Sequence, residues 1–176
     1  MNSYHNQQKK PIYFYYLSFI ITITVASIIT IADLATKKIV FNYLINQNSG
    51  FDLKLLPFFS LVIVRNNGIS FGMFNNINNA STIFTILQST IAVLILIYAS
   101  FNRYKIVAVA LGLIVGGAFG NAIDRAINGA VADFLDFHWD VYHWPAFNLA
   151  DSAICCGVLI CLIHDLFCKK IVVKNS

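Results

Sequence analysis

The residues best suited to chemistry lie close together in this sequence. Five of the eight acidic residues fall between Gly116 and Asp151, and all eight are aspartates. Asp124 closes one long apolar run, Asp133 follows in the connection, and Asp151 lies just inside the next apolar run. Ionisable groups at the edge of a bilayer are costly and usually have a function. The spacing therefore indicates a site built from aspartates at a membrane boundary.

Two carboxylates in one site can divide acid–base work between them. The proximity of like charges raises one pKa, so one carboxyl stays protonated as a general acid while the other activates water. Asn121 precedes Asp124 by one helical turn, and Asn148 precedes Asp151 by the same spacing, so each amide could orient a carboxylate or a substrate carbonyl. This repeat favours Asp124 with Asp151. Helix caps and an ion pair between Asp124 and Arg125 would explain the same residues without catalysis.

Other constellations are less well supported. Ser152 has no base placed to activate it. His138 and His143 could bind a metal with Asp136 and Asp140, but aromatic residues interleave them, as at a membrane interface. The cysteines lie in or just after the last apolar run and are expected to pack there: Cys155, Cys156, Cys161 and Cys168. We therefore expect no metal and no cofactor.

Elements that cross a membrane must hold these aspartates. The chain is 58% hydrophobic and 11% charged, more apolar than a soluble domain of 176 residues. We expect one all-α integral membrane domain over residues 1–176, in which each apolar run spans the hydrocarbon core as a helix. The four predicted spans cover about 11–32, 81–101, 106–124 and 146–167, and the segments outside the membrane cover about 33–80 and 125–145.

Two local patterns indicate how the spans are held together. Asp33 and Lys37 are four residues apart at the end of the first span, so on a continuing helix they can form an ion pair. Gly112, Gly116 and Gly120 repeat every fourth residue on one face of the third span. Glycine at this spacing allows two helices in lipid to approach closely. We expect this face to pack against another span.

The segment between the first two spans has the signals of a small β-sheet. Residues 51–64 alternate in part between apolar and polar and are interrupted by Pro57. Asn67-Gly68 follows and favours a tight turn. We expect short strands on the membrane surface there, with Gly68 letting the backbone approach a neighbour or ligand.

The basic residues predict the orientation of the chain. An even number of spans places both termini on one side, together with the short turn that carries Arg103 and Lys105. Seven Lys and Arg residues fall on this side, against five spread through the longer connections on the other. The positive-inside rule therefore favours cytoplasmic termini and an outward-facing aspartate cluster.

Five blocks of residues follow one another along the chain: DLATK at 33–37, NNGISFG at 66–72, GGAFGNAIDR at 116–125, VADF at 131–134 and FNLADS at 147–152. In this order they resemble the signature blocks of the bacterial lipoprotein signal peptidases, also called signal peptidase II. The resemblance extends from the first span to the last. Ala132 departs from it, because the family usually has Val at that position.

The resemblance implies a four-span aspartic endopeptidase of the bacterial inner membrane, with a small extracytoplasmic sheet between helices 1 and 2. It would cleave prolipoproteins on the amino side of a diacylglyceryl-modified cysteine, in contact with membrane lipid and without metal or nucleic acid. The catalytic aspartates of the family fall on Asp133 and Asp151. The remaining matched positions would support the site or bind substrate: Asp33, Lys37, Asn66, Gly68, Asn121, Asp124, Arg125, Asn148 and Ala150.

The residue spacing and the resemblance nominate different pairs. We favour Asp133 with Asp151, because Asp124 adjoins Arg125 and a carboxylate held by arginine stays ionised and structural. Asp151 lies near a helix start, where the helix dipole favours an anion, so we expect it to be the base and Asp133 the acid. The alternatives are a small transporter or proton channel, whose charges should lie near mid-span, and a structural membrane protein without catalysis.

Overall fold

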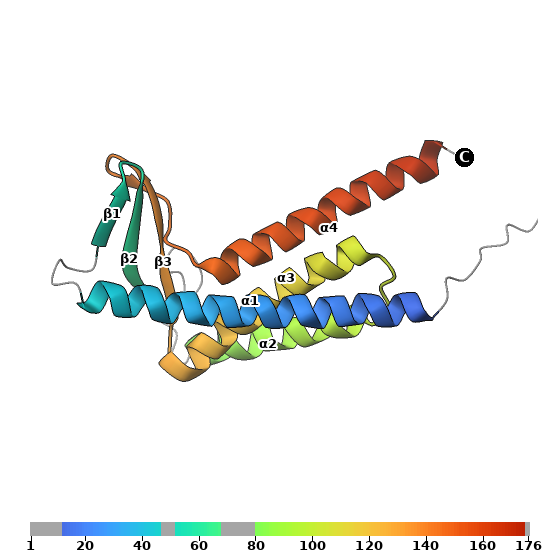
Figure 1. Ribbon diagram of the computed structural model, residues 1–176, viewed down its shortest axis with the longest axis horizontal. Coiled ribbons are helices and arrows are strands. Elements are labelled where there is room, and N and C mark those ends of the chain that lie inside the picture. The colour runs from blue at the N-terminus through green and yellow to red at the C-terminus, as the bar shows by residue number, and fades with distance from the viewer. Residues whose placement is uncertain (1–11, 47–51, 68–79, 175–176) are drawn as a thin grey trace, which may run out of the picture.

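The computed structural model describes residues 12–46, 52–67 and 80–174. In this part of the chain, long helices run along one another and a small antiparallel sheet lies at one end of them (Figure 1). The helices are α1 (Tyr13–Asn46), α2 (Ala80–Ala99), α3 (Lys105–Asn128) and α4 (Leu149–Lys174). Each contains a stretch long and apolar enough to cross a membrane, which confirms the expected class of fold.

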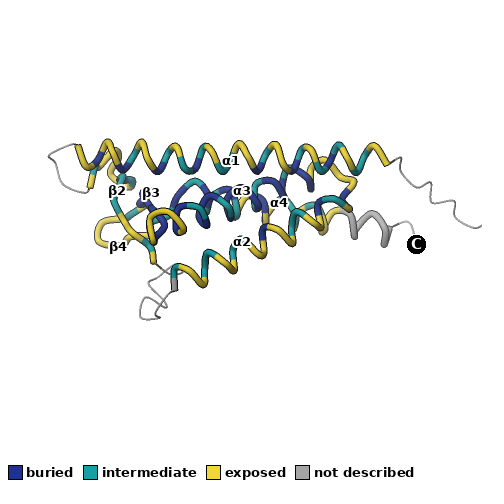
Figure 2. The backbone as a smooth tube through the Cα atoms, turned by 90° about the horizontal axis from the view of Figure 1, so that it is seen from below, coloured by how far each residue is buried: buried dark blue, intermediate teal, exposed yellow. Residues whose placement is uncertain are grey.

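Helix α3 is the centre of the bundle. It packs against α1, α2 and α4, and 67% of its apolar stretch is buried, against 22% or less in each of the other three helices. Figure 2 shows α3 as the most continuously buried helix. The outer helices expose isoleucine and leucine side chains over most of their length, as helices surrounded by lipid do.

Glycines let the helices approach α3 closely. A Cβ at Gly112 would lie 2.8 Å from the carbonyl oxygen of Thr22, and one at Gly116 would lie 2.6 Å from that of Ala26, both on α1. The predicted glycine face therefore packs against another span. Gly117 makes an equally close contact on the other side of α3, where it meets the backbone of Ala150 at the start of α4.

Helix α1 continues well beyond the end of the predicted first span, to Asn46. Its buried face repeats at helical spacing past the membrane boundary, through Asp33, Lys37 and Phe41. The ring of Phe41 packs with Ala132 and Phe134 of the sheet. This contact with a distant segment explains why the helix persists where the local sequence becomes mixed.

The sheet is built from both connections between the helices. Strands β1 (Asp52–Leu56) and β2 (Phe59–Asn66) confirm the expected short strands, and they pair as a hairpin that turns at Pro57, a turn that was not predicted. The connection between α3 and α4 adds β3 (Val131–Trp139) and β4 (Tyr142–His143), giving the antiparallel order β1-β2-β3-β4. The sequence analysis did not predict these two strands. The predicted turn at Asn67-Gly68 includes Gly68, which lies outside the described residues.

Candidate active site

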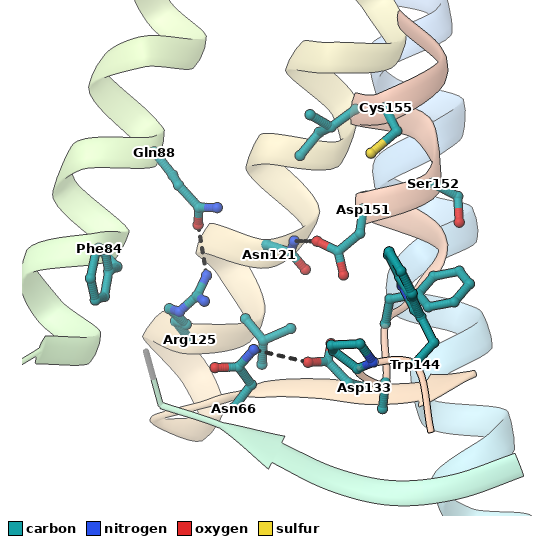
Figure 3. Close-up of a pocket in the computed structure, with 15 residues that line it drawn as sticks. Asn66, Phe84, Gln88, Asn121, Arg125, Asp133, Trp144, Asp151, Ser152 and Cys155 are labelled. Atoms are coloured by element: carbon teal, nitrogen blue, oxygen red, sulfur yellow. Dashed lines mark hydrogen bonds between the residues drawn. The ribbon is translucent and has the colours of Figure 1, made fainter. Parts of the chain in front are cut away.

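A cavity of about 540 Å³ lies where α2, α3 and α4 meet the sheet (Figure 3). Asp133 reaches it from β3 and Asp151 from the first turn of α4. The register of the sheet brings β2 alongside, with Val64 opposite Asp133, so that Asn66 also lines the cavity. Two carboxylates carried by different elements therefore line the same cavity.

Asp133 is a buried carboxyl, with 2% of its surface exposed. The side-chain amide of Asn66 donates to its Oδ2 at 3.0 Å, and that of Asn148 donates to its Oδ1 at 2.7 Å. Burial raises the pKa of Asp133 to about 6, and the charge of Asp151 adds to the rise, whereas the two amides and Lys37 oppose it. At neutral pH a fraction of the molecules therefore holds this carboxyl in its protonated form.

Asp151 is held at the N-terminus of α4 by reciprocal hydrogen bonds with Asn148. The backbone N–H of Asp151 donates to the side-chain oxygen of Asn148 at 3.0 Å, and the backbone N–H of Asn148 donates to Asp151 Oδ2 at 3.2 Å. Asn121 Nδ2 donates to Asp151 Oδ1 at 2.8 Å. This is a capping-box arrangement, and the accepted bonds and the positive end of the helix dipole stabilise negative charge on Asp151.

Asn148 connects the two carboxylates directly. Its Nδ2 donates both to Asp133 and, at 3.1 Å, to the side-chain oxygen of Asn121, while its backbone N–H bonds Asp151. The side-chain amide of Asn148 donates to Asp133 and its side-chain oxygen accepts the N–H of Asp151, so its role in orienting the pair stays a prediction. Asn121 behaves differently from expectation, because it bonds Asp151 on the next helix and not Asp124 on its own.

A buried ion cluster lies behind the cavity. Lys37 Nζ is 2.7 Å from Asp33 Oδ2, which confirms the predicted pair, and 3.5 Å from Asp124 Oδ2. The same ammonium donates to Asn121 Oδ1 at 2.8 Å. Asp33 also accepts the backbone N–H of Ala150 at 2.9 Å. The cluster therefore links α1 to α3 and to the start of α4.

Asp124 is a structural carboxylate in this arrangement. It accepts the backbone N–H of Ala132 and the side-chain amide of Asn128, both at 2.8 Å, and it does not line the cavity. Lys37 forms an ion pair with Asp124, and the charges of Asp124 and Arg125 also attract each other. The guanidinium of Arg125 lies on the cavity side of α3, where its Nη1 donates to Gln88 Oε1 at 2.7 Å.

The predicted site residues that the structure describes therefore form two layers. Those that line the cavity are Asn66, Asn121, Arg125, Asp133 and Asp151. Those that lie behind it and hold the first set are Asp33, Lys37, Asp124, Asn148 and Ala150. Gly68 is outside the described residues.

The sequence analysis missed the side of the cavity formed by α2 and the wall that follows β4. Phe84 and Gln88 line it from α2, and residues 144–147 line it just before α4. Gln88 could have been noticed as the one amide in a long apolar run. The wall carries no comparable local signal, because its position depends on the pairing of β3 and β4.

His138 and His143 lie on the sheet and do not line the cavity. His143 Nδ1 is 2.8 Å from Asp136 Oδ2, and His138 Nε2 is 3.1 Å from the hydroxyl of Ser60. The two imidazole rings stack with centroids 4.9 Å apart. Over the described residues, no three His, Cys or Asp side chains are arranged to hold a metal ion.

Comparisons with known proteins show which family the chain resembles. A model of the family described as signal peptidase (SPase) II matches residues 25–167. The lipoprotein signal peptidase of Francisella tularensis subsp. mediasiatica (strain FSC147) is 44% identical over 82% of this chain and 91% of its own length. That of Syntrophotalea carbinolica is 40% identical over 82% of this chain and 90% of its own length.

Two solved structures are also similar. Both are described as bacterial membrane enzymes determined by the in meso method. The one at 2.3 Å resolution superposes with a TM-score of 0.68 at 30% identity, over 82% of this chain and 87% of the other. The one at 1.9 Å resolution superposes with a TM-score of 0.69 at 29% identity, over 82% of this chain and 92% of the other.

Proposed function

The chain belongs to the signal peptidase II family, and we propose that it removes signal peptides from prolipoproteins with Asp133 and Asp151 as its catalytic pair. The bond cleaved is on the amino side of a cysteine that carries a diacylglyceryl group. The observation that carries the assignment is that both carboxylates line one cavity and are bonded to the same residue, Asn148. Asp124, the alternative partner, has its oxygens engaged outside that cavity.

The different environments of the pair support different roles. Asp133, whose pKa is raised to about 6, is the general acid, and Asp151 is the general base. Asp151 takes a proton from the attacking water while Asp133 gives its proton to the carbonyl oxygen of the scissile amide. When the tetrahedral intermediate collapses, a proton passes to the leaving amine and one carboxyl again holds a proton. Because the two carboxylates interact, their apparent pKa values describe the pair and not either aspartate alone.

We further propose that the chain is one integral membrane domain of the bacterial cytoplasmic membrane, with cytoplasmic termini and an outward-facing site. The distribution of Lys and Arg supports this orientation. The cavity lies at the sheet end of the helices, beside the apolar surfaces of α2 and α4, where Phe84 and Ile154 contribute to its lining. A lipid-modified cysteine can be held there with its acyl chains in the bilayer.

The transporter or proton-channel alternative gains no support. It would place ionisable groups near the middle of the spans, as a transport path requires. The carboxylates of the cavity instead lie at one end of the bundle, with Asp133 on a strand and Asp151 in the first turn of its helix.

The assignment is tested by cleavage of a diacylglyceryl-modified preprolipoprotein in detergent micelles. Asp133→Asn and Asp151→Asn are each expected to lower kcat at least about 10²-fold, because each removes one proton-transfer group. Asp52→Asn, at an exposed position of β1, is the matched control and should cleave at the wild-type rate. A metal chelator should leave the rate unchanged. Wild-type activity in either of the first two folded variants removes that residue from the mechanism.

A further inference from the structure

Helix α2 contributes one amide side chain to the cavity. Two threonines of this helix, Thr85 and Thr90, donate their hydroxyl hydrogen bonds to carbonyl oxygens one turn earlier in α2 itself. Gln88 instead crosses to α3, where its Oε1 accepts Arg125 Nη1 at 2.7 Å (Figure 3). An amide within an apolar span costs free energy unless it is hydrogen-bonded. The bond to Arg125 offsets that cost for Gln88.

The guanidinium of Arg125 lies inside the cavity, although the position of this residue on α3 would let it reach water. Arg125 is in the last turn of α3, close enough to the membrane boundary for its long side chain to extend towards water. It is nevertheless buried, with 7% of its surface exposed, and it lines the cavity beside Asp133 and Asp151. Some feature of the bundle must therefore turn the guanidinium inwards.

Among the described residues of α2, Phe84 and Gln88 contact the guanidinium, and the charges of the nearby carboxylates attract it as well. Phe84 and Gln88 are one turn apart on α2, and Phe84 is on the side of Gln88 that faces the sheet. The ring of Phe84 lies 6.0 Å from Arg125 Cζ, within range of a cation–π contact. Gln88 draws the guanidinium deeper into the bundle, while Phe84 occupies the space nearer the rim.

We propose that Gln88 is a positioning residue for substrate binding. It holds the guanidinium of Arg125 inside the cavity, where Arg125 donates to a carbonyl oxygen of the bound signal peptide. This inference rests on the proposed peptidase function. It adds a residue of α2 that none of the five matched sequence blocks contains, and it assigns the α2 side of the cavity to substrate binding and not to proton transfer.

The test is the KM of Gln88→Met for the diacylglyceryl-modified preprolipoprotein. Methionine keeps the length and shape of glutamine but cannot accept the hydrogen bond. Because bonds that involve a charged group are strong, KM is expected to rise about tenfold while kcat stays within about twofold of wild type. Gln88→Glu keeps an acceptor oxygen at the same reach and should hold KM within about threefold. Thr90→Val, a polar-to-apolar change elsewhere on α2, should behave as wild type.

A double-mutant cycle separates positioning from a general effect on the fold. If Gln88 acts through Arg125, adding Gln88→Met to Arg125→Ala should not raise KM further. An equal rise of KM in both backgrounds, or an unchanged KM in Gln88→Met alone, would overturn the inference while leaving the peptidase assignment intact. No cleavage by the wild type would overturn the peptidase assignment, and this inference with it.

Discussion

Asp133 and Asp151 have the same side chain, but their surroundings give them different chemistry. Asp133 is enclosed on a strand between α3 and α4, and burial raises its pKa to about 6. Asp151 is at the positive end of α4 and accepts bonds from Asn121 and from the backbone of Asn148. Identical groups therefore have different surroundings, because one is on a buried strand and the other at a helix N-terminus.

The first prediction concerns pH. Because Asp133 acts in its protonated form, kcat/KM should fall as pH rises through the pKa of about 6. Asn66 donates to Asp133 and so stabilises its ionised form, which lowers the pKa. Asn66→Ala should therefore move the falling limb to higher pH. The measurement is kcat/KM between about pH 4.5 and 8.5; a limb that moves to lower pH would contradict the assignment of Asp133 as the acid.

Asn148 provides a second prediction. Serine at this position can still cap α4, but it cannot reach Asp133 with an amide. We expect Asn148→Ser to lower kcat about 10-fold to 100-fold, since the loss of a partner that orients a reacting group costs about this much. Because the cap is kept, Tm should fall by only a few degrees. Asn128→Ser, which affects a bond to Asp124 only, is the comparison. Equal activity of the two variants would show that Asn148 only caps the helix.

At the scale of the elements, the site depends on how closely α1 and α4 approach α3. Gly112 and Gly116 allow contact with the backbone of α1, and Gly117 allows contact with the backbone of α4 at Ala150. Ala150 is one residue before Asp151, and its N–H is bound by Asp33 of α1. The start of α4, and hence the position of Asp151, is therefore set by packing against two helices.

The third prediction follows from this packing. In Gly117→Val the new side chain would overlap the carbonyl of Ala150 and the side chain of Ile154, so α4 must shift away from α3. Overpacking of this kind costs about 1–3 kcal/mol, and it displaces Asp151, so both Tm and kcat should fall. Ala126→Val adds volume at an exposed position of the same helix and should change neither. Wild-type kcat in Gly117→Val would show that α4 can move without disturbing the pair.

At the scale of the whole molecule, one ammonium group joins most of the bundle. Lys37 of α1 contacts Asp33 on its own helix and both Asp124 and Asn121 on α3. Asp124 then binds the amide of Ala132 in β3, and Asp33 binds that of Ala150 in α4. Helices α1, α3 and α4 and strand β3 therefore share one buried network in which two carboxylates depend on a single cation.

The fourth prediction tests that network. Lys37→Met would leave Asp33 and Asp124 buried without their cation, and breaking a buried ion pair on one side typically costs about 3–5 kcal/mol. We expect a large fall in Tm in detergent and loss of cleavage at growth temperature. Lys38→Met changes the neighbouring, exposed lysine and should leave both near wild type. A small effect of Lys37→Met, similar to that of Lys38→Met, would show that the network does not hold the bundle together.

The sequence by itself determined the features that depend on neighbouring residues. Helix-length apolar runs, the pairing of Asp33 with Lys37, and the glycine face of α3 all follow from helical periodicity. The short strands between the first two spans follow from local alternation. These predictions succeeded because their causes lie within a few turns of one chain segment.

Only the tertiary structure decided which carboxylates share the cavity and what holds them. Asn121 bonds Asp151, 30 residues away, and not Asp124 in its own helix. Asp33 binds the amide of Ala150, 117 residues away. The extension of α1 to Asn46 and the pairing of β3 with β2 likewise depend on contacts between distant segments. Local spacing shows which groups can reach one another on a helix, but buried polar groups bond whichever partner the packed bundle brings within reach.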